Sequence, residues 1–268
     1  YPIARVSAKI AVGLTLDEIR IANTPASFEP TLDYIVTKVA RFPFDKFSDA
    51  SNKLGTQMKA TGEVMSIGRT MEESLLKAVR SLETGVCHIY HKKFDKWSND
   101  DLLAYIKGGT DDRLYAIGQL IRNGVDLALI YDKTKIDMFF LEKFKNIVEF
   151  EKVVRAHPMD VETLRAAKRM GFSDKYIGQL WGLSQNEMYR LREKNNVFPV
   201  YKMIDTCASE FASYVPYFYS TYEEENESIV SGKEKIIVLG SGPIRIGQGV
   251  EFDYSTVHAI WSIRAAGY

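Results

Sequence analysis

Residues 134–153, TKIDMFFLEKFKNIVEFEKV, decide the fold class of the central part of this chain. Their apolar side chains recur at the spacing of one helix face. Six of them form an aromatic and aliphatic stripe: Phe139, Phe140, Phe144, Ile147, Val148 and Val153. We expect a long helix that begins at Thr134, and a stripe of this kind more often packs in a core than binds a ligand.

The same helical pattern continues on both sides of this stretch, from about residue 85 to about residue 197. Ser98 and Thr110 stand where N-caps stand, before apolar residues at helical spacing, and Gly108 and Gly124 follow at the expected ends. No period of about 20–50 residues repeats, which argues against a solenoid. We therefore expect an all-helical domain.

A helix-turn-helix pattern closes this domain at residues 172–196, FSDKYIGQLWGLSQNEMYRLREKNN. Ser173 and Ser184 are the expected N-caps, and Gly182 is in the turn between the helices. The alternative function is therefore a nucleic-acid-binding module fused to an α/β piece.

The charges of this stretch weigh against that alternative. A DNA-reading second helix needs exposed cations, and Arg190, Arg192 and Lys194 are available. Glu187 and Glu193 lie among them, so the whole stretch carries only about one net positive charge. Helix pairs of this kind are common in all-helical domains, and we favour a packing role.

The first eighty residues mix helix and strand. Helical spacing covers residues 3–12, Thr15 with Glu18 forms a capping-box pattern, and residues 34–39 and 63–67 are expected strands. A capping box at Thr70 and Glu73 then predicts an amphipathic helix that carries Leu75, Leu76, Val79 and Leu82 on one face. This segment is typical of the end of an α/β or α+β domain.

The C-terminal residues show a strand, a glycine-rich turn and a helix. Residues 235–239 are the expected strand, and Gly240, Gly242 and Gly247 follow it. A dinucleotide fingerprint requires glycine at its sixth place, where Arg245 stands, so we expect no dinucleotide. A single strand also needs neighbours, and we expect this segment to open a domain that continues beyond Tyr268.

Composition excludes several classes of protein. The chain has 268 residues, is 46% hydrophobic, and has 35 basic and 35 acidic residues, so its formal net charge is zero. We therefore expect a globular protein that binds neither nucleic acid nor membrane. Two cysteines and the lack of a signal peptide or a long apolar run predict a cytoplasmic location.

No metal site or catalytic group stands out in the sequence. Cys87, His88 and His91 lie close together in CHIYH, but a zinc site needs a fourth ligand, so a metal there is disfavoured. The acidic clusters are explained by helix N-termini or an exposed linker, and no P-loop or catalytic triad pattern occurs. We expect no catalytic, cofactor-binding or metal-binding residues in this chain.

Five long strings resemble the large subunit of carbamoyl phosphate synthetase. They are TPASFEPTLDYIVTKVARFPFDKF (24–47), GTQMKATGEVMSIGRTMEESLLKAVRSLE (55–83), PVYKMIDTCASEFA (199–212), YFYSTYEEE (217–225) and VLGSGPIRIGQGVEFDYSTVHA (238–259). The resemblance implies a mixed fold in three parts: residues 1–81 as the α+β end of the first ATP-grasp half, residues 82–220 as the helical oligomerisation domain, and residues 221–268 as the doubly wound, pre-ATP-grasp opening of the second half.

The resemblance also implies an activity for the parent enzyme. That enzyme is an ATP-dependent carbon–nitrogen ligase that uses ATP with Mg or Mn and receives ammonia from a glutaminase small subunit. Glu63, Gly249 and Glu251 are similar in position to residues that line its carbamate passage; the alternative is that Glu63 forms a salt bridge and Glu251 caps a helix. This chain alone is expected to be inactive, to bind no cofactor and to self-associate through its helices.

Overall fold

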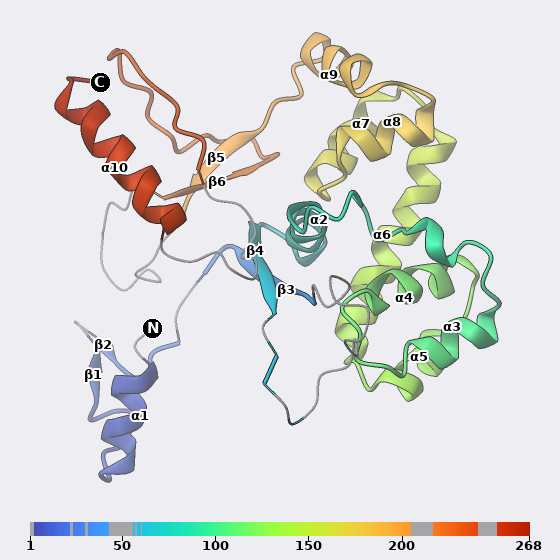
Figure 1. Ribbon diagram of the computed structural model, residues 1–268, viewed down its shortest axis with the longest axis horizontal. Helices are drawn as coiled ribbons and strands as arrows, with labels where there is room; N and C mark the ends of the chain where they lie inside the picture. Colours follow the sequence, from blue (N-terminus) through green and yellow to red (C-terminus); the bar gives the residue numbers. More distant parts are fainter. Residues whose placement is uncertain are drawn as a thin grey trace.

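The computed structural model describes residues 3–21, 24–29, 32–42, 56, 58–59, 61–204, 217–240 and 251–268, with side chains of the last range from Tyr254 onward. A body of packed helices contacts a β-hairpin through one helix, and the first and last helices lie apart from that body (Figure 1). No described helix is long and apolar enough to cross a membrane.

The helical body contains seven α-helices and one short 3-10 helix among the described residues. They are η2 (Lys92–Phe94), α3 (Asn99–Tyr105), α4 (Arg113–Arg122), α5 (Leu127–Thr134), α6 (Met138–Ala156), α7 (Val161–Arg169), α8 (Asp174–Trp181) and α9 (Gln185–Lys194). Leu102, Leu120, Ile130 and Leu141 are fully buried in one continuous core. The expected all-helical domain is confirmed for residues 85–197.

The long helix α6 begins four residues later than the sequence predicts. Thr134 ends the preceding helix α5, because Lys135 takes a left-handed backbone with φ 56°. Asp137 then caps α6 by accepting a hydrogen bond of 2.8 Å from the backbone N–H of Phe139. A side-chain cap at Asp137 therefore replaces the one expected at Thr134.

The aromatic stripe of α6 is only partly in the core. Phe144, Ile147 and Val148 are buried as expected. Phe139, Phe140 and Val153 are instead 50%, 42% and 41% exposed. The prediction that the whole stripe packs inside is wrong, because the helices that contact α6 leave these three side chains exposed.

Local capping signals predict most of the other helix starts correctly. Ser98, Ser173 and Ser184 cap α3, α8 and α9, and α9 has the complete capping box with Glu187. The exception is α4, whose N-cap position is held by Asp112 and not by Thr110.

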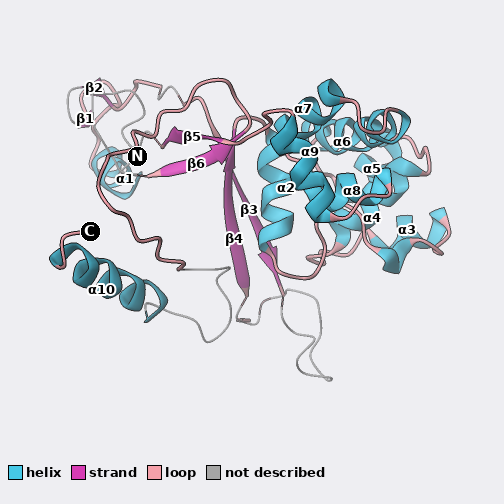
Figure 2. Cartoon of the chain, turned by 90° about the horizontal axis from the view of Figure 1, so that it is seen from above, coloured by secondary structure: helices cyan, strands magenta, loops and turns pink. Residues whose placement is uncertain are grey.

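The β-hairpin consists of β3 (Ile35–Arg41) and β4 (Gly62–Gly68), which pair antiparallel from Ile35↔Gly68 to Arg41↔Gly62. Helix α2 (Met71–Ser81) follows directly, capped by Thr70 as predicted. It lies between this hairpin and the helical body (Figure 2). A second antiparallel pair, β5 (Val200–Met203) with β6 (Phe218–Thr221), leads out of the helical body.

Helix α2 belongs to two clusters of buried residues. Leu75, Leu76 and Val79 pack in the core of the helical body. Ala78 and Leu82 pack with Val64 of the hairpin. The helix therefore joins the hairpin and the helical body with two apolar faces.

The N-terminal residues form a small unit of their own. Helix α1 (Ile3–Ala11) is confirmed, and Val6, Ile19 and Ala26 are buried together beside the short strands β1 (Arg20–Ile21) and β2 (Thr24–Pro25). Glu18 does accept a hydrogen bond of 2.8 Å from the backbone N–H of Thr15. This pair closes a turn before β1, so the helix expected there is not formed.

The C-terminal segment forms its helix but not its strand. Helix α10 (Glu251–Ala265) is present, whereas residues 234–240 form neither strand nor helix. Ile237 and Leu239 are 85% and 93% exposed. A strand needs a neighbour for its backbone groups, and no described strand lies beside this segment. Gly242, Arg245 and Gly247 lie outside the described residues.

Candidate functional site

The contact between α2, β6 and the helical body is held by buried charges. The Glu73 carboxylate, 1% exposed, accepts hydrogen bonds of 2.8 Å from the backbone N–H of Arg69 and 3.1 Å from Thr221 Oγ1. It also pairs with Lys77 Nζ at 2.8 Å, and Lys77 donates to the backbone oxygen of Ser220. Glu73 therefore fixes α2 against residues that are far away in the sequence.

A second carboxylate, the partly buried Asp174 at the start of α8, binds two cations. Lys168 Nζ lies 2.8 Å from Asp174 Oδ1, and Arg192 Nη2 lies 2.8 Å from Oδ2. Burial lowers the pKa of Lys168 to about 8, although Asp174 opposes the shift. Arg192 is buried in this pair, so it is not free to contact a nucleic-acid phosphate.

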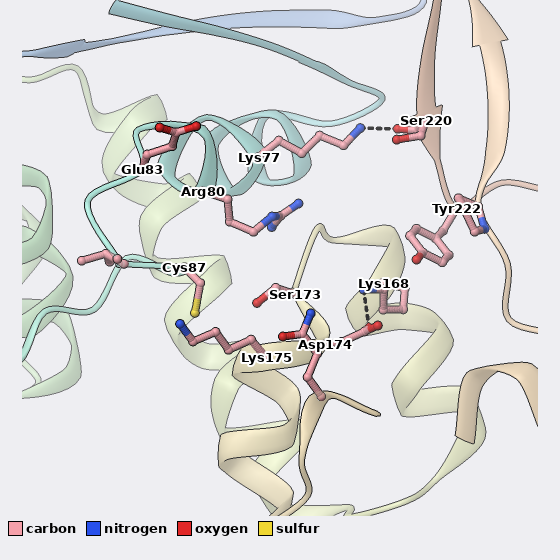
Figure 3. Close-up of a pocket in the computed structure, with 14 residues that line it drawn as sticks. Lys77, Arg80, Glu83, Cys87, Lys168, Ser173, Asp174, Lys175, Ser220 and Tyr222 are labelled. Atoms are coloured by element: carbon pink, nitrogen blue, oxygen red, sulfur yellow. Dashed lines mark hydrogen bonds and ion pairs between the residues drawn. The ribbon is translucent and has the colours of Figure 1, made fainter. Parts of the chain in front are cut away.

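A cavity of about 520 Å³ is lined by Asp174 and by Lys77, the partner of Glu73. Its wall includes Lys77 and Arg80 of α2, Cys87, the first residues of α8 and Tyr222 (Figure 3). The Arg80 guanidinium lies among the lining side chains and donates a hydrogen bond of 2.5 Å to the backbone oxygen of Gly171. This cavity could not be predicted from a single motif, because its cations come from three separate helices, α2, α7 and α8.

A third buried cluster lies deeper in the helical body. Arg122 forms an ion pair with Glu151, and His88 Nε2 lies 2.9 Å from Glu151 Oε1. Glu151 is buried, which raises its pKa, but the hydrogen bonds from His88 and Arg122 outweigh this and keep it below the ordinary value. An ionised carboxylate only accepts, so Nε2 of His88 carries the proton and donates it.

The three candidate ligands in CHIYH make different contacts in the structure. His88 stacks on Tyr176 at 3.8 Å between ring centroids, whereas His91 Nδ1 accepts a hydrogen bond from the backbone N–H of Lys93. Cys87 lines the cavity described above. Within the described ranges, no group of three or more His, Cys, Asp or Glu side chains is placed to hold a metal ion. We assign no residue to ATP or its metal.

The three residues predicted for the carbamate passage are not brought together by the described structure. Glu63 lies on β4 with its side chain exposed, and it pairs with Lys38 Nζ of β3 at 2.7 Å. Gly249 lies outside the described residues. Glu251 is the first residue of α10, but its side chain is also not described. The passage therefore stays a prediction.

Helices α5 and α6, which pack on each other, expose apolar side chains that we call the α5–α6 apolar surface. Its members are Leu129, Tyr131, Phe139 and Phe140, each at least 40% exposed. Lys135 and Lys143 lie over the rings of Tyr131 and Phe139 at 5.6 and 5.3 Å. Aromatic residues are enriched in protein interfaces.

The fold and its buried contacts define a helical domain joined to a β-hairpin through α2. The comparison with family models agrees with this class. Residues 63–196, half of the chain, match the oligomerisation domain of the carbamoyl-phosphate synthetase large chain, and residues 232–268 match the preATP-grasp domain of carbamoyl phosphate synthase. The chain therefore belongs to the carbamoyl-phosphate synthetase large chain family.

Proposed function

We propose that this chain is the connecting segment of a glutamine-dependent carbamoyl phosphate synthetase large chain. The parent would make carbamoyl phosphate from bicarbonate, glutamine-derived ammonia and two ATP, for arginine and pyrimidine biosynthesis. Its partner would be a glutaminase small subunit. The proposal is supported by two domains of one family that match in order along the chain.

One structural observation carries the connecting role. Helix α2 packs in the hairpin cluster and in the core of the helical body, and Glu73 ties it to Thr221 of β6. The end of the first synthetase half would therefore be fixed to the helical domain without a flexible joint.

The segment itself would be structural. We expect no carbamoyl phosphate when the chain is mixed with ATP, magnesium, bicarbonate and ammonia, beyond a heat-treated control. Product formation above that control would overturn the structural role.

We propose that the helical domain binds a second copy of this chain through the α5–α6 apolar surface. The family description as an oligomerisation domain supports self-association, and the exposed aromatic residues of α5 and α6 supply apolar area for it. Phe139→Ser with Phe140→Ser should lower the molar mass measured by light scattering at equal concentration.

Val153→Ser is the matched control, because Val153 is also exposed on α6 but lies at the far end of the helix from the two phenylalanines. It should associate like the unchanged chain. A chain that is monomeric at high concentration, or equal association of both variants, would contradict this surface.

The proposed passage for carbamate keeps a reactive intermediate away from water. In the intact enzyme, Gly249→Phe should narrow the passage and reduce carbamoyl phosphate synthesis while bicarbonate-dependent ATP hydrolysis continues. Gly232→Phe is the control, because a side chain at Gly232 meets nothing within 4 Å. Equal loss of both activities would reject the assignment.

A further inference from the structure

The cavity beside Arg80 has more positive than negative side chains in its wall. The cations are Lys77, Arg80, Lys168 and Lys175, and the carboxylates are Glu83 and Asp174. Its volume of about 520 Å³ is within the range of small-molecule sites.

The carboxylates of Glu73 and Asp174 already form ion pairs. Glu73 pairs with Lys77, and Asp174 is shared by Lys168 and Arg192. Arg80 and Lys175 form no ion pair with any residue in the described part of the chain, and Arg80 is hydrogen-bonded only to the Gly171 carbonyl there. With Glu83 counted, the cavity wall still has two more positive than negative side chains.

Burial makes this excess charge unfavourable. Loss of water around the side chains lowers the pKa of Arg80, of Lys77 and of Lys168. An anion in the cavity would offset this loss with charge-assisted hydrogen bonds. Ser173, Asp174 and Lys175 also place the N-terminal turn of α8 at the wall, where backbone N–H groups favour negative charge.

We propose that this cavity binds a phosphate group, free or carried by a small molecule, and that Arg80 and Lys175 contact it. The Tyr222 ring and Pro199 provide the less polar part of the wall. This site uses none of the residues predicted for the carbamate passage, so it can be tested separately from the proposed function.

Thermal unfolding of the chain in sodium phosphate, against sodium chloride of equal ionic strength, tests binding. Phosphate should raise the midpoint, because a ligand that binds the folded state stabilises it. Lys175→Gln should weaken the apparent phosphate affinity about tenfold. Lys175 is exposed, so this variant leaves the packing intact. Arg80→Gln should weaken binding at least as much.

Arg190→Gln is the control, since Arg190 is exposed on α9 and does not line the cavity. It should bind phosphate like the unchanged chain. Equal phosphate stabilisation in the unchanged chain and in Lys175→Gln would mean an adventitious ion only and would overturn the proposal. So would the absence of any effect beyond chloride.

Two further measurements locate the anion and its source. In a Cys207→Ser background, phosphate should slow alkylation of Cys87 by iodoacetamide, because the thiol lines the same cavity. An unchanged rate at a phosphate concentration that saturates the thermal shift would overturn the proposed location. Tighter binding of phenyl phosphate than of inorganic phosphate would support a phosphate monoester, and the reverse order would support the free ion.

Discussion

The helical body and the C-terminal segment both contain apolar residues, but these residues differ in burial. Leu102, Ile130 and Leu141 of the body are completely buried, whereas Ile237 and Leu239 of the C-terminal segment are almost completely exposed. Helix α10 forms because helix hydrogen bonds are local, but the neighbouring residues 233–240 form no strand. The difference shows that a helix start can be predicted from nearby residues, while a strand depends on partners elsewhere.

The largest effect that we predict concerns the buried ion pair of the helical body. Glu151→Gln leaves Arg122 buried without its counter-charge, and we expect the free energy of unfolding to fall by about 3–5 kcal/mol. Urea denaturation followed by circular dichroism measures this change.

The control for that variant is Glu149→Gln on the same helix. The Glu149 side chain is 57% exposed and pairs weakly with Lys145, so its loss should change stability by less than about 0.5 kcal/mol. Equal effects of the two substitutions would show that the body is not held by buried charge.

The change in the free energy of unfolding with pH should also depend on this cluster, through His88. Burial lowers the pKa of His88 to about 4 from its ordinary value of 6.5, and Arg122 already balances the Glu151 charge. Between pH 6.5 and pH 4, His88 is protonated in the unfolded chain but stays neutral in the folded chain. The free energy of unfolding should therefore fall as the pH drops from 6.5 to 4, by on the order of 3 kcal/mol in all.

His88→Asn removes this titration, so the slope of stability against pH in that window should become flatter. His157→Asn, an exposed histidine beyond the end of α6, should keep the slope of the unchanged chain. An unaltered slope in His88→Asn would assign the acid sensitivity to other groups.

Replacing a glycine by alanine should also affect the two regions differently, with a smaller change in stability than the substitutions above. At Gly178 of α8 a Cβ would lie 2.5 Å from the backbone oxygen of Leu183, so Gly178→Ala should cost about 1–3 kcal/mol despite the better helix propensity of alanine. At Gly232 nothing lies within 4 Å, so Gly232→Ala should be nearly neutral. Thermal unfolding of both variants gives the comparison, and a neutral Gly178→Ala would mean that α8 and α9 pack loosely.

The smallest effect is expected in the C-terminal segment. Leu239→Ser removes an apolar side chain that is 93% exposed, so the free energy of unfolding should change by less than about 0.5 kcal/mol. A loss above about 1 kcal/mol in urea denaturation would show that this segment packs against the body in solution, and the contrast between the regions would disappear.

The features that sequence analysis predicted correctly have local causes. Thr70, Ser98, Ser173 and Ser184 each accept a hydrogen bond from a backbone N–H three residues later, and such a signal is contained in four or five residues. The strands β3 and β4 were also predicted, at residues 34–39 and 63–67, from their residue types, but their pairing was not.

The features that were missed depend on distant contacts. Whether the Phe139 side chain is buried depends on which helices cover α6, and the periodicity of apolar residues does not contain that information. The cavity needs Arg80, Lys168, Lys175 and Tyr222 from four segments, so no single motif could indicate it. Lys77 and Arg80, three residues apart on one side of α2, were a signal that the sequence did contain.

Helix α2 has a practical consequence for anyone who exchanges parts between members of this family. A chimera whose crossover falls just after Ser81 would separate Leu75, Leu76 and Val79 from their neighbours in one parent and set them against foreign side chains in the other. A crossover before Gly62 would still separate β4 from β3, so a crossover before Ile35 is needed to transfer both strands with α2 and with the helices that α2 contacts. The natural unit of transplantation therefore starts two strands and one helix earlier than a boundary at residue 81 suggests.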